Sequence, residues 1–180
     1  RLGDFMAGAF FPLASLFIDI LIIIMFFSKK SIKNKETNLY SVLIIVNFIE
    51  CLFDVIGISY IRTGGDIAIF TMLQKIDMVM IISWAALMFY YVYSVSFEKV
   101  DGRKIERFIL FVLVISSMVT LLLPNVPVIT ENTIDSSGLS PDIAYGAIIL
   151  FAVGIIVTVV TSIIKNPKNI KNKKYYPLYA

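Results

Sequence analysis

Six polar residues that could do chemistry interrupt the long apolar stretches of this sequence: Asp19, Asn47, Glu50, Asp54, Lys75 and Asp77. A charged side chain at the centre of a bilayer costs about 2.5–3.5 kcal/mol on insertion scales, so such residues normally face a bundle interior or a water-filled cavity. Four of the six are carboxylic acids, and one is a cation. The set predicts either a small-molecule or proton site, or an internal salt-bridge cluster in which Lys75 neutralises Glu50 and Asp54 while Asp19 is neutral or bonded to Asn47.

The elements that must position these residues are five apolar stretches, at residues 5–27, 39–61, 67–97, 105–123 and 143–164. A membrane helix needs about 20 mainly apolar residues, and each stretch reaches or nearly reaches that length. The chain is 58% hydrophobic with a mean hydropathy of +0.86, well above a typical soluble domain. We therefore predict an all-α, polytopic transmembrane helix bundle, with residues 1–180 as a single domain.

Counting residues from the expected turns places the six polar residues in one layer, between the middle of the membrane and its outer third. The first and second stretches are expected to reverse near residue 33, and the second and third near residue 64. Residues equidistant from a turn lie at the same depth. Asp19 is therefore level with Asn47, Glu50 with Asp77, and Lys75 lies between the levels of Glu50 and Asp54. Asn47, Glu50 and Asp54 also share one helix face, because they are three and four residues apart.

Lysine and arginine concentrate in three of the five links. Residues 28–38, 98–107 and 165–174 hold 13 of the 16 basic residues, whereas residues 62–66 hold one and residues 124–142 hold none. Short cytoplasmic loops are enriched in Lys and Arg, so we predict a multi-pass protein of the cell membrane with its N-terminus outside.

Two further expectations concern the last two links. In the outer link 124–142 we predict a turn at residues 135–138 and a new helix beginning around Pro141 and Asp142. The aromatic run 175–180 is expected to begin a sixth span, in a chain cut from a longer protein.

The composition excludes several kinds of chemistry. The chain has no histidine, so it holds no His-ligated metal, no His acid–base catalyst and no phosphoacceptor histidine. Its single cysteine, Cys51, cannot form a disulfide within the chain. We predict no catalytic residue, no metal and no cofactor in this segment. The net charge of +3 follows from the cytoplasmic links, so we predict the lipid bilayer rather than nucleic acid as partner.

Three pieces of the chain carry a resemblance to a known family: FFSKKSIKNKETNLYS at residues 26–41, ISW and FYYVY at residues 82–84 and 89–93, and SGLSP at residues 137–141 followed by Tyr145. With these pieces the chain resembles the N-terminal sensor region, of about seven spans, of bacterial membrane sensor histidine kinases that continue into a GHKL-type ATP-binding domain. The resemblance implies a kinase and its phosphoacceptor histidine downstream, and a homodimer. It supplies no active-site residue and no ligand for this segment.

The expected function is a membrane-embedded signal-input domain that passes a signal to a downstream cytoplasmic kinase domain. The alternative is a small secondary transporter or proton-coupled carrier that uses Asp19, Glu50, Asp54 and Asp77 as relay groups. An intramembrane enzyme is less favoured, because the sequence has no Cys–His pair and no metal-ligand spacing. Further spans and a soluble kinase-like domain after Ala180 would favour the sensor, and an inverted repeat would favour the carrier.

Overall fold

The structure is a computed structural model that describes residues 2–28, 35–97, 103–129 and 134–165, with side chains for 12–28, 35–97, 104–129 and 136–164. It contains five long helices and one β-hairpin: α1 (Leu2–Ser28), α2 (Lys35–Arg62), α3 (Ile67–Ser96), α4 (Arg103–Leu122), β1 (Val126–Ile129), β2 (Ile134–Ser137) and α5 (Leu139–Lys165).

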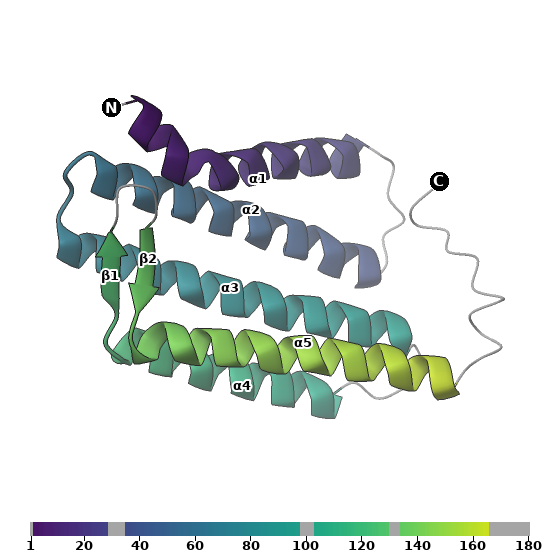
Figure 1. Cartoon of the computed structure of the whole chain (residues 1–180). Coiled ribbons are helices and arrows are strands. Elements are labelled where there is room, and N and C mark those ends of the chain that lie inside the picture. Colours follow the sequence, from purple (N-terminus) through teal and green to yellow (C-terminus); the bar gives the residue numbers. More distant parts are fainter. Residues whose placement is uncertain (1, 29–34, 98–102, 130–133, 166–180) are drawn as a thin grey trace.

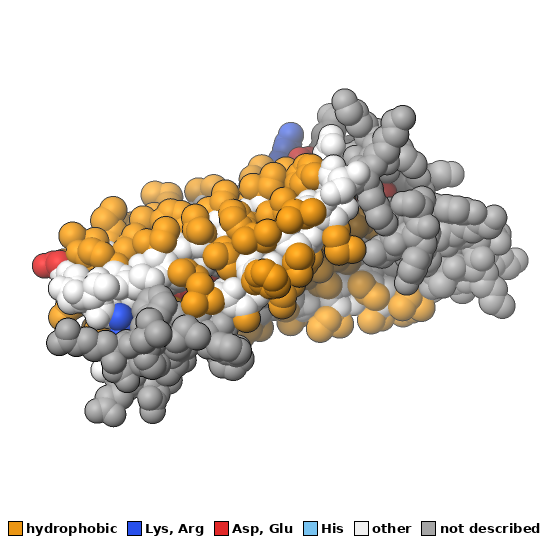
Figure 2. Space-filling view, turned by 90° about the horizontal axis from the view of Figure 1, so that it is seen from above, with side chains coloured by type: hydrophobic (Ala, Val, Ile, Leu, Met, Phe, Trp, Pro, Cys, Tyr) orange, Lys and Arg blue, Asp and Glu red, His pale blue; other side chains and the backbone are white. Residues whose placement is uncertain are grey.

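Four of the helices are long and apolar enough to cross a membrane by length and composition: α2, α3, α4 over Lys104–Leu122, and α5 over Leu139–Ile164. Within α1 the residues with described side chains form a shorter apolar helix, Pro12–Ser28. The surface seen in Figure 2 is covered over most of its described part by hydrophobic side chains. Such a surface is expected of helices in contact with lipid, so the prediction of a helical membrane protein is confirmed at this level.

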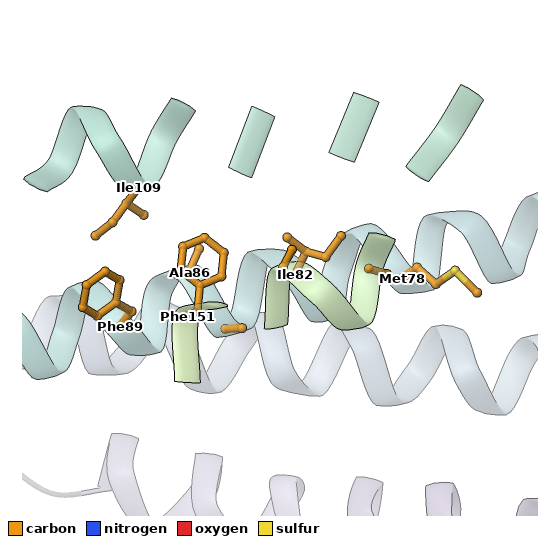
Figure 3. Close-up of a cluster of buried hydrophobic side chains, with 9 residues drawn as sticks. Met78, Ile82, Ala86, Phe89, Ile109 and Phe151 are labelled. Carbon is orange, nitrogen blue, oxygen red and sulfur yellow. The ribbon is translucent and has the colours of Figure 1, made fainter. Parts of the chain in front are cut away.

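The helices are arranged as a row that ends in a cluster. The helix α1 packs on α2, α2 packs on α3, and α3 packs on both α4 and α5, which also contact each other (Figure 1). The core of the cluster lies between α3, α4 and α5, where Ile82 and Ala86 face Phe151 (Figure 3). Gly154 on α5 lies so close to Phe89 that a Cβ atom there would be 3.0 Å from the ring. Small residues thus let α3 and α5 approach closely, as in other membrane bundles.

The turn between α2 and α3 is built by two glycines and a cap. Gly64 has φ +88°, a conformation that glycine adopts without steric cost. Gly65 lies against the ring of Tyr60, whose hydroxyl accepts a hydrogen bond from the backbone N–H of Asp66 at 3.1 Å. The Asp66 carboxylate then caps α3 by accepting from the N–H of Ala68 at 2.7 Å. This end of α2 and α3 is therefore closely tied together.

The link between α4 and α5 corrects the prediction of a turn at residues 135–138. Residues 134–137 form strand β2, which pairs antiparallel with β1, and the connection between the strands lies at residues 130–133, outside the described residues. The β-branched residues of the two strands favour this extended pairing. Only Gly138 turns the chain, with φ +118°, before α5 begins at Leu139 with Pro141 and Asp142 in its first turn, where a helix was predicted to start.

The base of the hairpin is fixed to the bundle by Ser140, which is fully buried. Its hydroxyl donates to the backbone oxygen of Thr120 at 2.8 Å, and its N–H donates to that of Pro124 at 3.2 Å. The hairpin extends from this base across α3 toward α2 (Figure 1). We call this end of the molecule, with β1, β2 and the α2–α3 turn, the hairpin end.

Candidate functional site

The first pair of predicted site residues joins α1 to α2. The Asn47 amide donates hydrogen bonds to both carboxylate oxygens of Asp19, at 2.9 Å and 2.8 Å. Asp19 is only 6% exposed, so this amide provides the polar contact that a buried carboxyl needs. The residues expected to be level with each other are thus brought together.

The next predicted residues extend the polar contacts from α2 to α3. Glu50 accepts a hydrogen bond from the thiol of Cys51 at 3.5 Å and interacts electrostatically with Asp54 and Asp19. Asp77 on α3 interacts electrostatically with both Asp54 and Glu50. Five of the six predicted residues thus form one continuous set across three helices, which we call the acidic row: Asp19, Asn47, Glu50, Asp54 and Asp77.

Lys75 does not belong to the acidic row, so the expected neutralisation of Glu50 and Asp54 by this lysine is wrong. Its ammonium group donates a hydrogen bond to the backbone oxygen of Leu121 at 2.9 Å, at the C-terminal end of α4. Residues two apart on a helix do not face the same way, so Lys75 points to α4 while Asp77 points to α2. In the part of the chain that the structure describes, no ion pair neutralises the four carboxyls of the row.

A cavity of about 160 Å³ lies beside the acidic row, between α2, α3, α5 and the hairpin. Asp54 and Asp77 line it from facing helices, and Oδ1 of Asp77 is buried with no hydrogen-bond partner among the described residues. The rest of the wall is mainly apolar and includes Phe70, which is 2% exposed. Concave, mostly apolar sites with a few convergent polar groups are the usual form of small-molecule sites.

Several residues of this cavity were not predicted from the sequence. Gln74 lines the wall and accepts a hydrogen bond from Asn125, just after α4, at 3.2 Å. Ser136 of β2 and Tyr145 of α5 line the cavity on the side of the hairpin. The sequence feature that could have pointed to Ser136 and Tyr145 is their position beside the SGLSP piece. Their residue types could not, since polar uncharged residues at the end of a span do not identify a site.

The chemistry open to this arrangement is the binding of protons or of a cation. Two partly buried carboxyls face a common space without a basic residue among the lining side chains, so protonation or a bound cation would remove the repulsion between them. Among the described residues no group of three or more His, Cys, Asp or Glu side chains is placed to hold a metal ion. Calcium takes six to eight oxygen ligands, so the pair Asp54 and Asp77 fits a less demanding cation better.

The opposite end of the bundle is joined by aromatic contacts. The ring of Tyr40 on α2 lies 5.8 Å from that of Tyr91 on α3, between ring centroids. Lys35 on α2 lies 5.1 Å from the centre of the Tyr90 ring, and the Tyr90 hydroxyl donates to Glu106 on α4 at 3.3 Å. These contacts link α2, α3 and α4 far from the cavity.

Comparison with known proteins adds no relative to this picture. The chain matches no family model, no curated protein and no solved structure.

Proposed function

We propose that this chain is the signal-input domain of a membrane sensor, in which the charge state of the cavity at the hairpin end alters the packing at the opposite end. The observation that carries the proposal is the placement of Asp54 and Asp77 on facing helices around one cavity. Two like charges across a helix interface repel, and neutralising either one favours closer packing of α2 on α3. Both helices continue without interruption to the opposite end, so a shift made at the cavity is carried there.

On this proposal the hairpin end faces the outside of the cell and the opposite end faces the cytoplasm. The concentration of lysine and arginine in three of the five links of the sequence supports this orientation, because short cytoplasmic loops are enriched in these residues. The recipient of the signal is a cytoplasmic histidine kinase domain downstream, acting as a homodimer, which the resemblance of three pieces of the chain to sensor kinases supports. The coding sequence after Ala180 tests this part directly, since a carrier would continue without a kinase.

A substitution that imitates the neutral form of a cavity carboxyl tests the coupling between the two ends without any ligand. Spin labels are attached at Asn38→Cys on α2 and Ile164→Cys on α5, both exposed near the cytoplasmic end, in a Cys51→Ser background. The distance between the labels is measured in liposomes. We expect Asp77→Asn to shift it by about 1–2 Å, the usual size of helix shifts at packed interfaces.

Asp142→Asn is the matched control for this experiment. It removes the same charge from the same end of the molecule, but Asp142 is exposed and does not line the cavity. An unchanged distance in Asp77→Asn, or the same shift in Asp142→Asn, would exclude coupling between the cavity and the cytoplasmic end.

The alternative is a proton-coupled carrier, which the continuity of the acidic row from α1 to α3 favours. Rows of carboxyls inside membrane bundles serve as proton relays. A carrier that passes protons along the row, even without its substrate, would acidify the interior of liposomes loaded with a pH-sensitive dye when the outside is made acidic, and Asp77→Asn would stop this flux. The sensor is expected to show the distance change and no flux.

A further inference from the structure

We propose that the cavity at the hairpin end binds a primary ammonium group, carried by a short alkyl chain, between the carboxylates of Asp54 and Asp77. This inference rests on the proposed function in that it names the class of signal, but it is tested by a separate measurement. The size, charge and wall of the cavity each point to this class of ligand.

The size selects a small molecule. A cavity of about 160 Å³ is close to an engineered apolar cavity of about 150 Å³ that takes up benzene, so it has room for roughly six non-hydrogen atoms. Tyr145 lines the cavity and is 56% exposed, so the cavity reaches the surface beside the hairpin. A ligand of this size can therefore enter without unfolding the bundle.

The charge selects a cation with hydrogen-bond donors. Asp54 and Asp77 provide two carboxylates, and the buried Oδ1 of Asp77 has no donor among the described residues. Lys75 does not supply that donor, because it is bonded to the backbone oxygen of Leu121 on α4. An ammonium group has three N–H donors and no acceptor, so it can bond to both carboxylates at once.

The wall selects an organic cation over a metal ion. Phe53 and Phe70 line the cavity together with aliphatic side chains, so one part of the ligand meets apolar surface and aromatic rings. Aromatic rings attract ammonium groups, while the apolar wall offers few oxygen atoms to replace the water around a bare metal ion. Butylammonium, with one nitrogen and four carbons, satisfies the size, the charge and the wall together.

Binding is measured as the rise in unfolding temperature of the full chain in nanodiscs. Their lipids are phosphatidylcholine and phosphatidylglycerol, neither of which carries a primary amine. Butylammonium chloride is the probe, and 1-butanol and sodium chloride are the matched neutral and inorganic controls. We expect a saturable rise with butylammonium alone. Asp77→Asn and Asp54→Asn should each weaken the apparent Kd at least about tenfold, since each removes a charge-assisted hydrogen bond. Asp142→Asn should leave it unchanged.

Two further measurements distinguish a lipid headgroup from a free amine as the source of the ammonium group. If nanodiscs containing phosphatidylethanolamine raise the unfolding temperature and compete with butylammonium, the group comes from a lipid headgroup. If they do not, it comes from a free amine. Either result keeps the site, whereas equal effects of 1-butanol or sodium chloride, or equal binding to Asp77→Asn, would overturn it. Binding that leaves the label distance unchanged would contradict the sensor and not the site.

Discussion

Replacing Lys75 by methionine discriminates between the position seen in the structure and a role inside the acidic row. In the structure its ammonium group makes one hydrogen bond, to the Leu121 carbonyl at the C-terminal end of α4. A cation at a helix C-terminus contributes about 0.3–1 kcal/mol when it is partly exposed. For a protein of this size 1 kcal/mol corresponds to about 2–4 °C in unfolding temperature. Lys75→Met should therefore lower the unfolding temperature by no more than about 4 °C.

The alternative position predicts a much larger effect. Breaking a buried ion pair with Glu50 and Asp54 would cost about 3–5 kcal/mol, or roughly 6–20 °C, at a pH where the carboxyls are ionised. The loss would shrink as acid protonates them. A backbone carbonyl does not titrate, so the bond to Leu121 predicts the same small loss at pH 5 and pH 8.

The assay is thermal unfolding in detergent, followed by circular dichroism at one scan rate because membrane proteins often unfold irreversibly. Lys75→Arg is the matched control and should retain most of the stability, since it keeps a donor and the charge. A loss above about 6 °C at pH 8 that Glu50→Gln with Asp54→Asn restores would refute the reasoning. It would place Lys75 in the acidic row after all.

Two other predictions follow from the fold. Gly65→Ala makes a Cβ atom overlap with the Tyr60 ring and should cost about 1–3 kcal/mol in unfolding free energy, less in a Tyr60→Ala background, whereas Gly146→Ala, with open space around it, should cost nothing. In a cysteine-free background, Val126→Cys in the hairpin should react with an impermeant thiol reagent on intact cells and Asn38→Cys only after permeabilisation. The reverse labelling would overturn the proposed orientation.

The helices and the depth of the polar residues could be predicted from the sequence because both depend on distance along the chain. Long apolar runs predict spans, and equal distances from a turn predict that Asp19 lies level with Asn47, which the structure brings within 2.9 Å. The pairing of Lys75 with Glu50 and Asp54 could not be judged from the sequence, because the depth of a residue does not tell to which side of the helix its side chain points. Only the packing of α4 against α3 determines that Lys75 points to Leu121.

The hairpin and the cavity could not be predicted from the same patterns. The strand residues Val126 and Ile134 carry a β-branched signal, but the Ser-Ser-Gly that follows reads equally well as a turn. The cavity is formed by residues of four elements that are distant in sequence, among them Ser136 and Tyr145. A site of this kind depends on how α5 and β2 approach α2, and no local spacing in the chain specifies that approach.

The uncompensated charge of the acidic row also connects the cavity with the proposed output. A bundle selected only for stability gains nothing from burying carboxyls without a cation, because apolar residues of similar size pack at no such cost. Near the cavity the ends of α2 and α3 are held by the Gly64–Gly65 turn and the Asp66 cap, so they have little freedom to separate. The contacts at the opposite end of the bundle are the ring pair Tyr40 and Tyr91 and the cation–π contact of Lys35 with Tyr90, each worth about 1 kcal/mol. A change of charge between Asp54 and Asp77 is therefore expected to appear as movement at the opposite end of α2 and α3, away from the Gly64–Gly65 turn.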